Sequence, residues 1–229
     1  MWKLVYIPHI IRIMKNSKKT VLIIVAVLLL SVLLYFLPIN KIIGRLPLIN
    51  RFYNNTSIEI LVKKGKAKVW IDGNDYGETP VSLENLPEGK YLVELEKIAD
   101  KGTFYKKQSF NVDLVRNTSA RIDLEIGPED ILHGIILYYT PISSSSQKGF
   151  LAVSSDVEGA KVFVDQEFVK GSPVTNLSLR ESQYDIKVVA EGYEDIEVPV
   201  LVRNNYVLNL KTYHFPIPVI FDTLDTNNE

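Results

Sequence analysis

The three histidines, His9, His133 and His214, are the first residues to consider for chemistry. A transition-metal site needs several His, Cys or carboxylate ligands at close spacing. None of the three has a second His, a Cys or a carboxylate at ligand spacing, and the chain contains no cysteine at all. We therefore expect no metal and no cofactor.

Catalytic motifs are absent from the sequence as well. It contains no Gly-x-Ser-x-Gly nucleophile motif, no Gly-x-x-x-x-Gly-Lys-Ser/Thr phosphate loop and no Gly-x-Gly-x-x-Gly motif. Most acidic residues fall at outward positions of predicted strands, which indicates a solvated face and not a catalytic pair in a cleft. These residues are Glu59, Glu94, Glu96, Asp113, Asp123, Glu125 and Glu197. We predict that the protein is not an enzyme.

One alternative for the acidic residues is a calcium site. Asp156, Glu158 and Asp165 lie close together in the sequence and would meet at one end of the second β region. Carboxylate oxygens are the ligands that calcium prefers. A solvated face is the favoured interpretation of these residues too.

Aromatic residues are the candidates for binding, because rings commonly anchor ligands at protein surfaces. Trp70 and Phe163 hold equivalent positions in two predicted strands, and they point away from the apolar residues on either side. They are either part of a second core face or exposed, and core packing is the favoured interpretation. The candidate binding surface comprises Trp70, Tyr76, Tyr105, Phe163 and Tyr193.

The elements that carry these residues are predicted to be strands. From Ser57 onward, apolar and polar residues alternate in short runs, as in residues 91–96 and 122–126, which predicts half-buried strands. Turn signals such as Asp72-Gly73-Asn74 separate the runs, and no window has a convincing period of 3.6. This pattern predicts a mainly β fold with antiparallel β-sandwiches.

The β region contains an internal repeat. Residues 67–72 read A-K-V-W-I-D and residues 160–165 read A-K-V-F-V-D, at an offset of 93 residues. The sequence Leu-Val-Arg-Asn occurs at 114–117 and again at 201–204, at an offset of 87. A duplicated domain is therefore expected. Asp72-Gly73 predicts a tight turn with positive φ, whereas Asp165-Gln166 predicts a turn of another kind or one residue longer.

At these positions the chain resembles the PEGA domain family. The family's pattern is a Pro-Glu-Gly-Ala-like turn, a strand ending in Asp-Gly, a Gly-x-Thr-Pro segment and a later Gly-x-Tyr. The second copy carries Val157-Glu158-Gly159-Ala160, and the first carries Gly77-Glu78-Thr79-Pro80 and Gly89-Lys90-Tyr91; Ser182-Gln183-Tyr184 departs from the last motif. The resemblance implies two tandem Ig-like sandwiches in an exported, envelope-associated protein without enzymatic activity, with contact to cell-surface material as one role.

A long apolar run precedes the β region. Residues 20–37 read T-V-L-I-I-V-A-V-L-L-L-S-V-L-L-Y-F-L, without charge, glycine or proline. As a helix this run spans about 27 Å, one bilayer core. It is longer than the apolar part of a signal peptide, and no small-x-small cleavage site follows. We predict a transmembrane helix that acts as an uncleaved signal anchor; a buried core helix is disfavoured because the run is apolar on all faces.

The charge distribution gives this helix a direction. Residues 1–57 hold eight Lys/Arg and no acidic residue, although the whole chain has 26 basic and 27 acidic residues. Five of the eight precede the apolar run, so the positive-inside rule places the N-terminus in the cytoplasm and the following domains outside the cell membrane. The acidic remainder argues against a nucleic-acid partner. Without cysteine, domains outside the cell have to be stabilised by core burial alone.

The predicted order of domains follows from these patterns. It is a cytoplasmic basic arm (1–19), a transmembrane helix (20–38), a stalk (39–56), a first PEGA-like β-sandwich (57–127), a linker with an apolar segment (128–148), a second PEGA-like β-sandwich (149–212) and a C-terminal tail (213–229). Residues 131–139 are too apolar for a free linker. They are an extra strand of the first sandwich, a surface that packs the two modules together, or a small binding or dimer patch.

Two functions fit this organisation. The first is a membrane-anchored, non-enzymatic cell-envelope protein whose tandem domains bind cell-wall or surface polysaccharide, or an envelope protein, outside the cell. The second is a structural spacer or scaffold subunit of a membrane complex. Exposure of the aromatic residues distinguishes the two, since a spacer needs no exposed rings.

Overall fold

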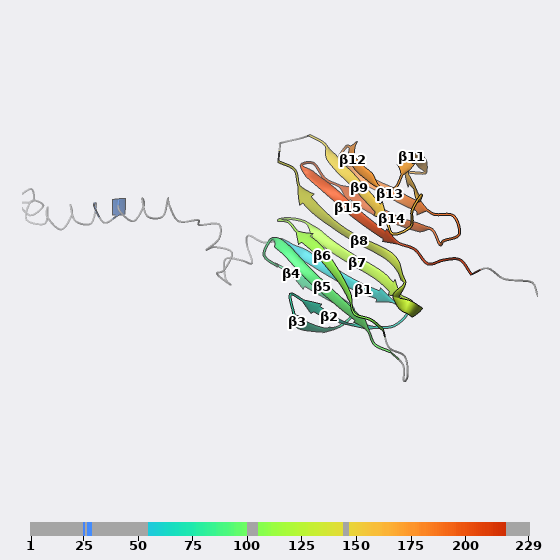
Figure 1. Cartoon of the computed structure of the whole chain (residues 1–229). Helices are drawn as coiled ribbons and strands as arrows, with labels where there is room; N and C mark the ends of the chain where they lie inside the picture. The colour runs from blue at the N-terminus through green and yellow to red at the C-terminus, as the bar shows by residue number, and fades with distance from the viewer. Residues whose placement is uncertain (1–24, 26, 29–54, 100–104, 144–146, 219–229) are drawn as a thin grey trace, which may run out of the picture. The chain divides into compact units, whose positions relative to one another are not determined.

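The computed structural model describes residues 25, 27, 28, 55–99, 105–143 and 147–218 (Figure 1). The chain divides into two compact units, Met1–Asn50 and Arg51–Glu229. In the first unit the described residues Val25, Val27 and Leu28 are helical and exposed. The rest of the predicted transmembrane helix, the basic arm and most of the predicted stalk lie outside the described residues. No helix among the described residues is long and apolar enough to cross a membrane.

Within the described part of Arg51–Glu229, fifteen strands follow one another along the chain. The first module contributes β1 (Ser57–Lys63), β2 (Ala67–Ile71), β3 (Asn74–Glu78), β4 (Val81–Glu84), β5 (Gly89–Lys97), β6 (Gln108–Leu114) and β7 (Ser119–Ile126). A 3₁₀ turn, η1 (Pro128–Asp130), leads into β8 (Leu132–Pro141). The second module contributes β9 (Gly149–Ser155), β10 (Lys161–Val164), β11 (Glu167–Gly171), β12 (Val174–Leu179), β13 (Ser182–Val189), β14 (Ile196–Val202) and β15 (Tyr206–Tyr213).

These strands form three sheets in the described residues. The largest has the order β12-β9-β15-β8-β7-β1-β4, and the four-stranded sheets have the orders β3-β2-β5-β6 and β11-β10-β13-β14. The prediction of a mainly β chain with two tandem modules is confirmed. The prediction of purely antiparallel pairing is wrong, because β1 pairs with β7 in parallel and β9 pairs with β15 in parallel. The long crossover that a parallel pair requires is supplied in each module by the strands between the two partners.

β8 is the central strand of the seven-stranded sheet and lies between β7 and β15 (Figure 1). Successive side chains of a strand point to opposite faces. Leu132 and Ile136 join the hydrophobic core of the first module, whereas Ile135 and Tyr139 join the core of the second. The two cores therefore lie on opposite faces of the seven-stranded sheet. Each module is a sandwich of its own four-stranded sheet and part of this shared sheet.

The apolar segment of the predicted linker is this central strand. Its apolar residues are consecutive because a strand that is buried on both faces has no solvent-exposed positions to alternate with. Two of the three interpretations of residues 131–139 apply together. β8 adds a strand beside β7 of the first module, and it joins the modules by pairing with β15 from Gly134 to Pro141. It is not a surface patch for a partner.

The two modules are related by an approximate two-fold rotation about the long axis of β8. β7 and β15 both pair with β8 in antiparallel fashion, so they run in the same direction on either side of it. The strand order β4-β1-β7 on one side repeats as β12-β9-β15 on the other. A rotation by half a turn about β8 exchanges the strands on its two sides and also exchanges the two faces of the sheet. This agrees with the two cores lying on opposite faces.

The strand register corrects the repeat derived from the sequence. Tyr91 pairs with Val112, and the equivalent Tyr184 pairs with Val200, so the second half of the repeat has an offset of 88 residues. Asn117 and Asn205, also 88 residues apart, both have positive φ, at 61° and 68°. The offset of 87 from the Leu-Val-Arg-Asn match is wrong by one residue. Four shared letters align a segment less reliably than the inward and outward alternation of a paired strand.

The turn after β10 is also different from the one predicted. Asp72 and Gly73 have φ of 49° and 78°, and Asp165 and Gln166 have φ of 48° and 70°. Both turns therefore have positive φ at both central positions, which is the tight hairpin turn expected only for the first. The prediction of another turn type at Asp165-Gln166 is wrong. Gln166 adopts a conformation that costs a non-glycine residue about 1–2 kcal/mol.

The first residues of the predicted C-terminal tail are part of the fold. Tyr213 is the last residue of β15, and His214 is buried, with 3% of its surface exposed. The ring of Phe215 lies 5.2 Å from that of His133, and Pro216 forms a β-bridge with Tyr193. The described C-terminal segment therefore packs across the loop that precedes β14. Residues 219–229 lie outside the described residues.

Candidate functional site

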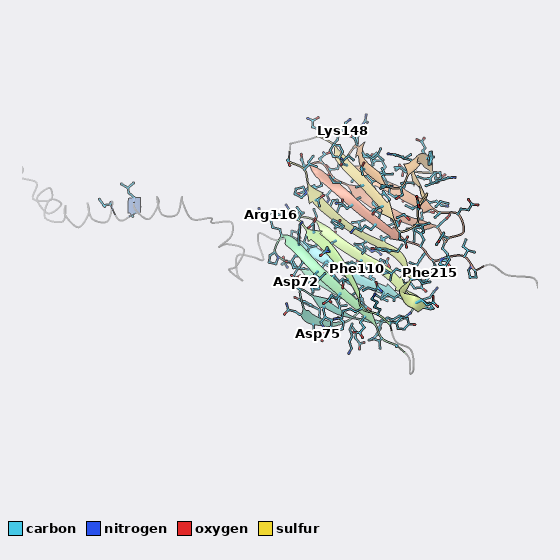
Figure 2. The ribbon with its side chains drawn as sticks, in the orientation of Figure 1. Asp72, Asp75, Phe110, Arg116, Lys148 and Phe215 are labelled. Carbon is cyan, nitrogen blue, oxygen red and sulfur yellow. The ribbon has the colours of Figure 1, made fainter. Side chains whose placement is uncertain are left out.

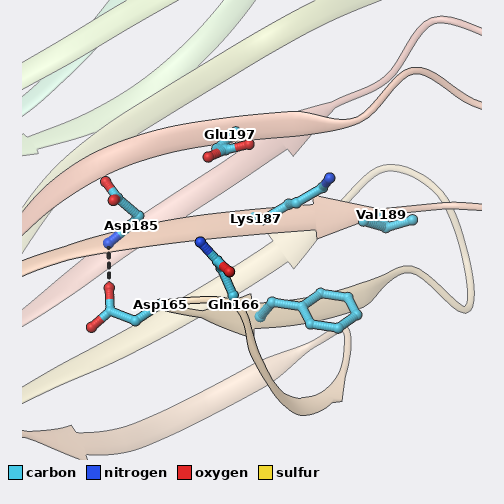
Figure 3. Close-up of a pocket in the computed structure, with 7 residues that line it drawn as sticks. Asp165, Gln166, Asp185, Lys187, Val189 and Glu197 are labelled. Atoms are coloured by element: carbon cyan, nitrogen blue, oxygen red, sulfur yellow. Dashed lines mark hydrogen bonds between the residues drawn. The ribbon is translucent and has the colours of Figure 1, made fainter.

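A hollow of about 690 Å³ lies on the outer face of the second four-stranded sheet (Figure 3). Its residues come from β10, the turn that follows β10, β13 and β14. The lining residues are Phe163, Asp165, Gln166, Asp185, Lys187, Val189 and Glu197. It combines one aromatic ring with several carboxylates and is open to solvent.

Alternation along β10 places Phe163 in this hollow. Val162 and Val164 on either side are buried in the core, so the side chain between them points outward. The ring of Phe163 packs edge-on against Phe168 of β11, at 5.6 Å between centroids and 64° between planes. Phe168 is 58% exposed. Phe168 was not among the residues predicted from the sequence, although an aromatic residue just after the predicted turn and five residues beyond Phe163 is the available signal.

The polar groups of the hollow are fixed by hydrogen bonds. The backbone N–H of Asp185 donates to Oδ1 of Asp165 over 2.9 Å (Figure 3). In the first module the N–H of Leu92 donates to Oδ1 of Asp72 over 2.8 Å, so the repeated aspartate closes the same turn in both copies. Lys187 forms an ion pair with Asp195 at 2.9 Å, and this hydrogen bond raises the pKa of Lys187.

The hollow presents carboxylate groups, which accept hydrogen bonds, beside the aromatic ring of Phe163. Lys187 is paired, so the remaining carboxylates of Asp165, Asp185 and Glu197 give the lining a negative charge. Such an arrangement can stack on the apolar face of a ligand and accept hydrogen bonds from its hydroxyl or amine groups. The chemistry it supports is binding.

The equivalent ring in the first module is covered. Trp70 points outward from β2, and Lys107 Nζ lies 4.0 Å from the centre of its ring. Lys107 also forms an ion pair with Glu94 at 3.7 Å. Trp70 and Phe163 are half-buried and belong to neither hydrophobic core, so the favoured interpretation of core packing is wrong for both. The outer face of the first module also carries Asp72 and Asp75 (Figure 2).

The other predicted aromatic residues do not join one surface. Tyr76 of β3 is 40% exposed. Tyr105 packs against the first core beneath Lys97, whose Nζ lies 4.8 Å from the ring centre. Tyr193 packs against the second core. Of the five candidates only Phe163 lines the large hollow.

The three acidic residues of the calcium alternative do not meet. The carboxylate of Asp156 accepts hydrogen bonds from the backbone N–H of His214, at 3.2 and 3.3 Å, and burial raises the pKa of Asp156. Asp165 lies instead beside Asp185. In the part of the chain that the structure describes, no group of three or more His, Cys, Asp or Glu residues is placed to hold a metal ion.

The two described histidines, His133 and His214, make contacts that hold segments of the fold together. His214 is hydrogen-bonded through Nδ1 to the carbonyl of Glu194 at 2.9 Å and through Nε2 to Thr212 Oγ1 at 3.0 Å. His133 of β8 lies 3.5 Å from a carboxylate oxygen of Glu194. The hydrogen bonds of His214 and the contact of His133 with Glu194 connect the end of β15 and β8 to the loop before β14.

Comparison with models of protein families gives one match in two copies. The model described as PEGA domain matches residues 56–129 and residues 148–214. Together these ranges cover more than half of the chain. A search of curated proteins found no match.

Proposed function

Because the chain belongs to the PEGA domain family and carries two copies in tandem, we propose that it is a membrane-anchored, non-enzymatic cell-envelope protein that binds envelope polymer outside the cell. The hollow beside Phe163 carries this proposal. It is open to solvent, has a volume of about 690 Å³ and contains an outward-facing ring with carboxylates around it. A polymer needs such an open site, because the chain has to continue past it on both sides.

Membrane anchoring is supported by the apolar run at residues 20–37 and the basic residues before it. In this proposal the N-terminus is cytoplasmic and both modules are extracytoplasmic. A periplasmic-type reporter fused after Glu229 is then active. An inactive reporter on a stably expressed fusion contradicts this topology.

The large hydrophobic cores are compatible with a location outside the cell. Each module buries a continuous cluster between two sheets, and such burial stabilises a domain without disulfides. The modules therefore suit an oxidising or a reducing compartment equally.

A structural spacer or scaffold is the second candidate, and one observation favours it. The seven-stranded sheet runs through both modules without interruption, which makes the body rigid and holds its two ends at a constant separation. In this alternative the two modules serve to hold other components of a complex at a fixed distance from the membrane. The ring of Phe163 then has no ligand.

A pull-down separates these functions. The full chain in detergent is incubated with isolated cell-wall material and, separately, with an extract of envelope proteins. Retention on cell-wall material supports polymer binding, and capture of a defined envelope protein instead supports the scaffold. Retention on neither contradicts the binding proposal.

A further inference from the structure

Strand β6 of the first module has a free edge, because it ends the sheet order β3-β2-β5-β6. A free edge presents backbone N–H and C=O groups that can pair with another chain, and proteins usually protect such edges. The other edge strands of the described sheets have this protection. β4 has only four residues, β3, β11 and β12 pair with their neighbours through a register shift, and β14 contains Pro199. β6 has seven residues in unbroken register and no proline.

The backbone of Asn111 points out of this edge. Asn111 lies opposite Leu92 of β5, but the N–H and the C=O of Leu92 both bond Asp72 on the other side of β5. The Leu92–Asn111 pair is therefore one of the pairs that exchange no hydrogen bond, and the N–H and C=O of Asn111 face away from β5. The backbones of Ser109 and Asp113 face the same way. In the part of the chain that the structure describes, no strand pairs with this side of β6.

The free edge points toward the second module's part of the seven-stranded sheet. β6 packs over β7 and β8, and the ring of Phe110 meets that of Tyr213 of β15 edge-on, at 6.1 Å between centroids. Burial and then the nearby charge of Asp113 raise the pKa of Tyr138 of β8. Sheets that pack face to face lie about 10 Å apart. A further strand beside β6 would therefore lie one layer above β15 and β9.

This part of the sheet has an uncovered face with little charge. Leu151 and Val153 of β9 enter the second core, as do Leu208 and Leu210 of β15, so the side chains that alternate with them point to the opposite face. We name this surface the open face. It comprises the half-buried residues Phe150, Ala152, Val207, Asn209 and Lys211.

The equivalent face of the first module is charged. The register pairs Glu59 with Arg121 in the first module and Ala152 with Asn209 in the second. The five positions of the open face correspond to Ser57, Glu59, Ser119, Arg121 and Asp123 in the first module. Arg121 forms ion pairs with Glu59 at 3.9 Å and with Asp123 at 2.9 Å. The two modules therefore differ most where the duplicated fold leaves the sheet uncovered.

The edge above the charged face is closed to strand addition. Pro199 of β14 corresponds to Asn111 of β6, because each precedes the residue that pairs with Tyr184 or Tyr91. Proline has no N–H to donate to an added strand. β14 also covers Asp123, which is only 8% exposed, so the sequence prediction of a solvated Asp123 is wrong. One side of the body thus has a blocked edge over a charged face, and the other has an open edge over a face with little charge.

An extended peptide matches the open edge and the open face together. The N–H and C=O groups on one side of an added strand pair with β6, and every second side chain points down to the sheet below. Apolar side chains at these positions gain from burial against Phe150 and Val207. Charged side chains there would lose solvation.

A second folded copy does not fit through the same edge. Antiparallel pairing of β6 with the β6 of a copy places the inner faces of both four-stranded sheets on the same side. The copy's seven-stranded sheet would then need the space that β15 and β9 already fill. A single strand with nothing packed beneath it has no such conflict.

We propose that the free edge of β6 and the open face bind an extended peptide segment of a partner protein, with apolar side chains at alternate positions. The segment adds as a fifth strand beside β6 and covers the open face. This interaction goes beyond the proposed polymer binding and does not depend on it. The hollow at Phe163 lies on the other four-stranded sheet.

The test measures binding of a synthetic heptapeptide to the full chain in detergent by calorimetry. The probe is acetyl-Lys-Val-Thr-Val-Thr-Val-Lys-amide, and the comparison peptide has serine in place of each valine. We expect the valine peptide to bind and the serine peptide to bind at least tenfold more weakly. Two further forms carry N-methyl groups on the threonine amides or on the valine amides. An added strand pairs with β6 through only one of these alternate sets, so one form loses at least tenfold in affinity and the other binds like the parent.

Two substitutions transfer a residue from the equivalent position of the other module. Asn111→Pro gives β6 the proline of β14, and Ala152→Glu gives the open face the glutamate of β1. Each is expected to lower affinity for the valine peptide at least tenfold. Because the other module already accommodates these residues, both variants are expected to fold, which circular dichroism checks. Glu59→Ala, on the charged face, leaves affinity unchanged.

Several results overturn the inference. They are absence of binding by the valine peptide, wild-type affinity in both variants, and equal binding of the two methylated forms. Binding of cellohexaose in place of the peptide assigns the face to a saccharide, and a dimer that Asn111→Pro dissociates in sedimentation assigns it to a second copy; either result overturns the peptide. Replacing Phe163 and Phe168 by alanine leaves peptide affinity unchanged, so a failure at β6 is distinguishable from a failure at the outer hollow.

Discussion

Ile135 and Ile136 are neighbours in β8, and their side chains lie in two different hydrophobic cores. Ile136 is 1% exposed in the core of the first module, and Ile135 is 5% exposed in the core of the second. One strand therefore stabilises both modules. The duplication is not a pair of independent domains on a linker but a single body built around a shared strand.

The first prediction concerns cooperative unfolding. Ile135→Ala and Ile136→Ala each remove a buried side chain and each lower the free energy of unfolding by about 2–5 kcal/mol. Because β8 belongs to both cores, either substitution destabilises the whole body, and denaturation stays a single transition. Circular dichroism and amide hydrogen exchange resolved by residue are the measurements. Loss of protection in the second module alone after Ile135→Ala contradicts the shared strand.

The second prediction concerns Gly134, where β8 lies too close to β7 for a side chain. A Cβ at this position would lie 2.1 Å from the carbonyl oxygen of Asp123, and φ is +130°. Gly134→Ala therefore forces the two strands apart and lowers stability by about 3 kcal/mol. Gly159 is the matched control, with φ of +76° and nothing within 4 Å, so Gly159→Ala costs only about 1–2 kcal/mol. Chemical denaturation compares the two, and equal losses contradict the close approach.

The third prediction concerns the turn at Gln166. The left-handed conformation costs a non-glycine residue about 1–2 kcal/mol, and glycine adds about 0.4–1 kcal/mol of unfolded-state entropy. Gln166→Gly is therefore expected to raise the free energy of unfolding by up to about 1.6 kcal/mol. Gly73→Gln makes the reverse change at the equivalent turn of the first module and lowers stability. Destabilisation by Gln166→Gly contradicts the strained turn.

The fourth prediction concerns pH. Burial lowers the pKa of His133 below its ordinary 6.5, although Glu194 and Glu125 oppose the shift. The folded state thus holds His133 neutral more firmly than the unfolded state does. The resulting stability is fully present above pH 6.5 and is lost as pH falls through the lowered pKa. In His133→Gln the free energy of unfolding, measured between pH 5 and 8, depends less on pH; an unchanged pH dependence contradicts this role.

Much of the fold can be predicted from local sequence. The predictions that were wrong concern features decided by strands distant in sequence. Alternation in β5 and β7 predicts the strands, and the repeat of A-K-V-W-I-D as A-K-V-F-V-D predicts the duplication. The place of β8 does not follow, because a continuous apolar run fits several buried environments. Whether it lies at the surface or between two cores is decided by strands distant in sequence.

The candidate sites were predictable only in part. The outward direction of Phe163 follows from the buried valines beside it. Its contact with Phe168 and its place beside Asp185 depend on the β10–β11 and β10–β13 pairings, which join segments apart in the sequence. Asp123 has the pattern of a solvated strand residue. Its burial depends on β14 of the other module, and no pattern within β7 carries that information.

The most direct test of the account is co-sedimentation of the full chain in detergent with isolated cell-wall polymer. The variant with Phe163→Ala and Phe168→Ala removes the pair of packed rings beside the outer hollow, and neither residue belongs to a hydrophobic core. Leu92→Ala removes an exposed apolar side chain on β5 of the first module and is the control. We predict binding by the wild type and by Leu92→Ala, with at least a tenfold loss of affinity for the double variant. Equal binding by all three proteins, or no binding by the wild type, contradicts the account.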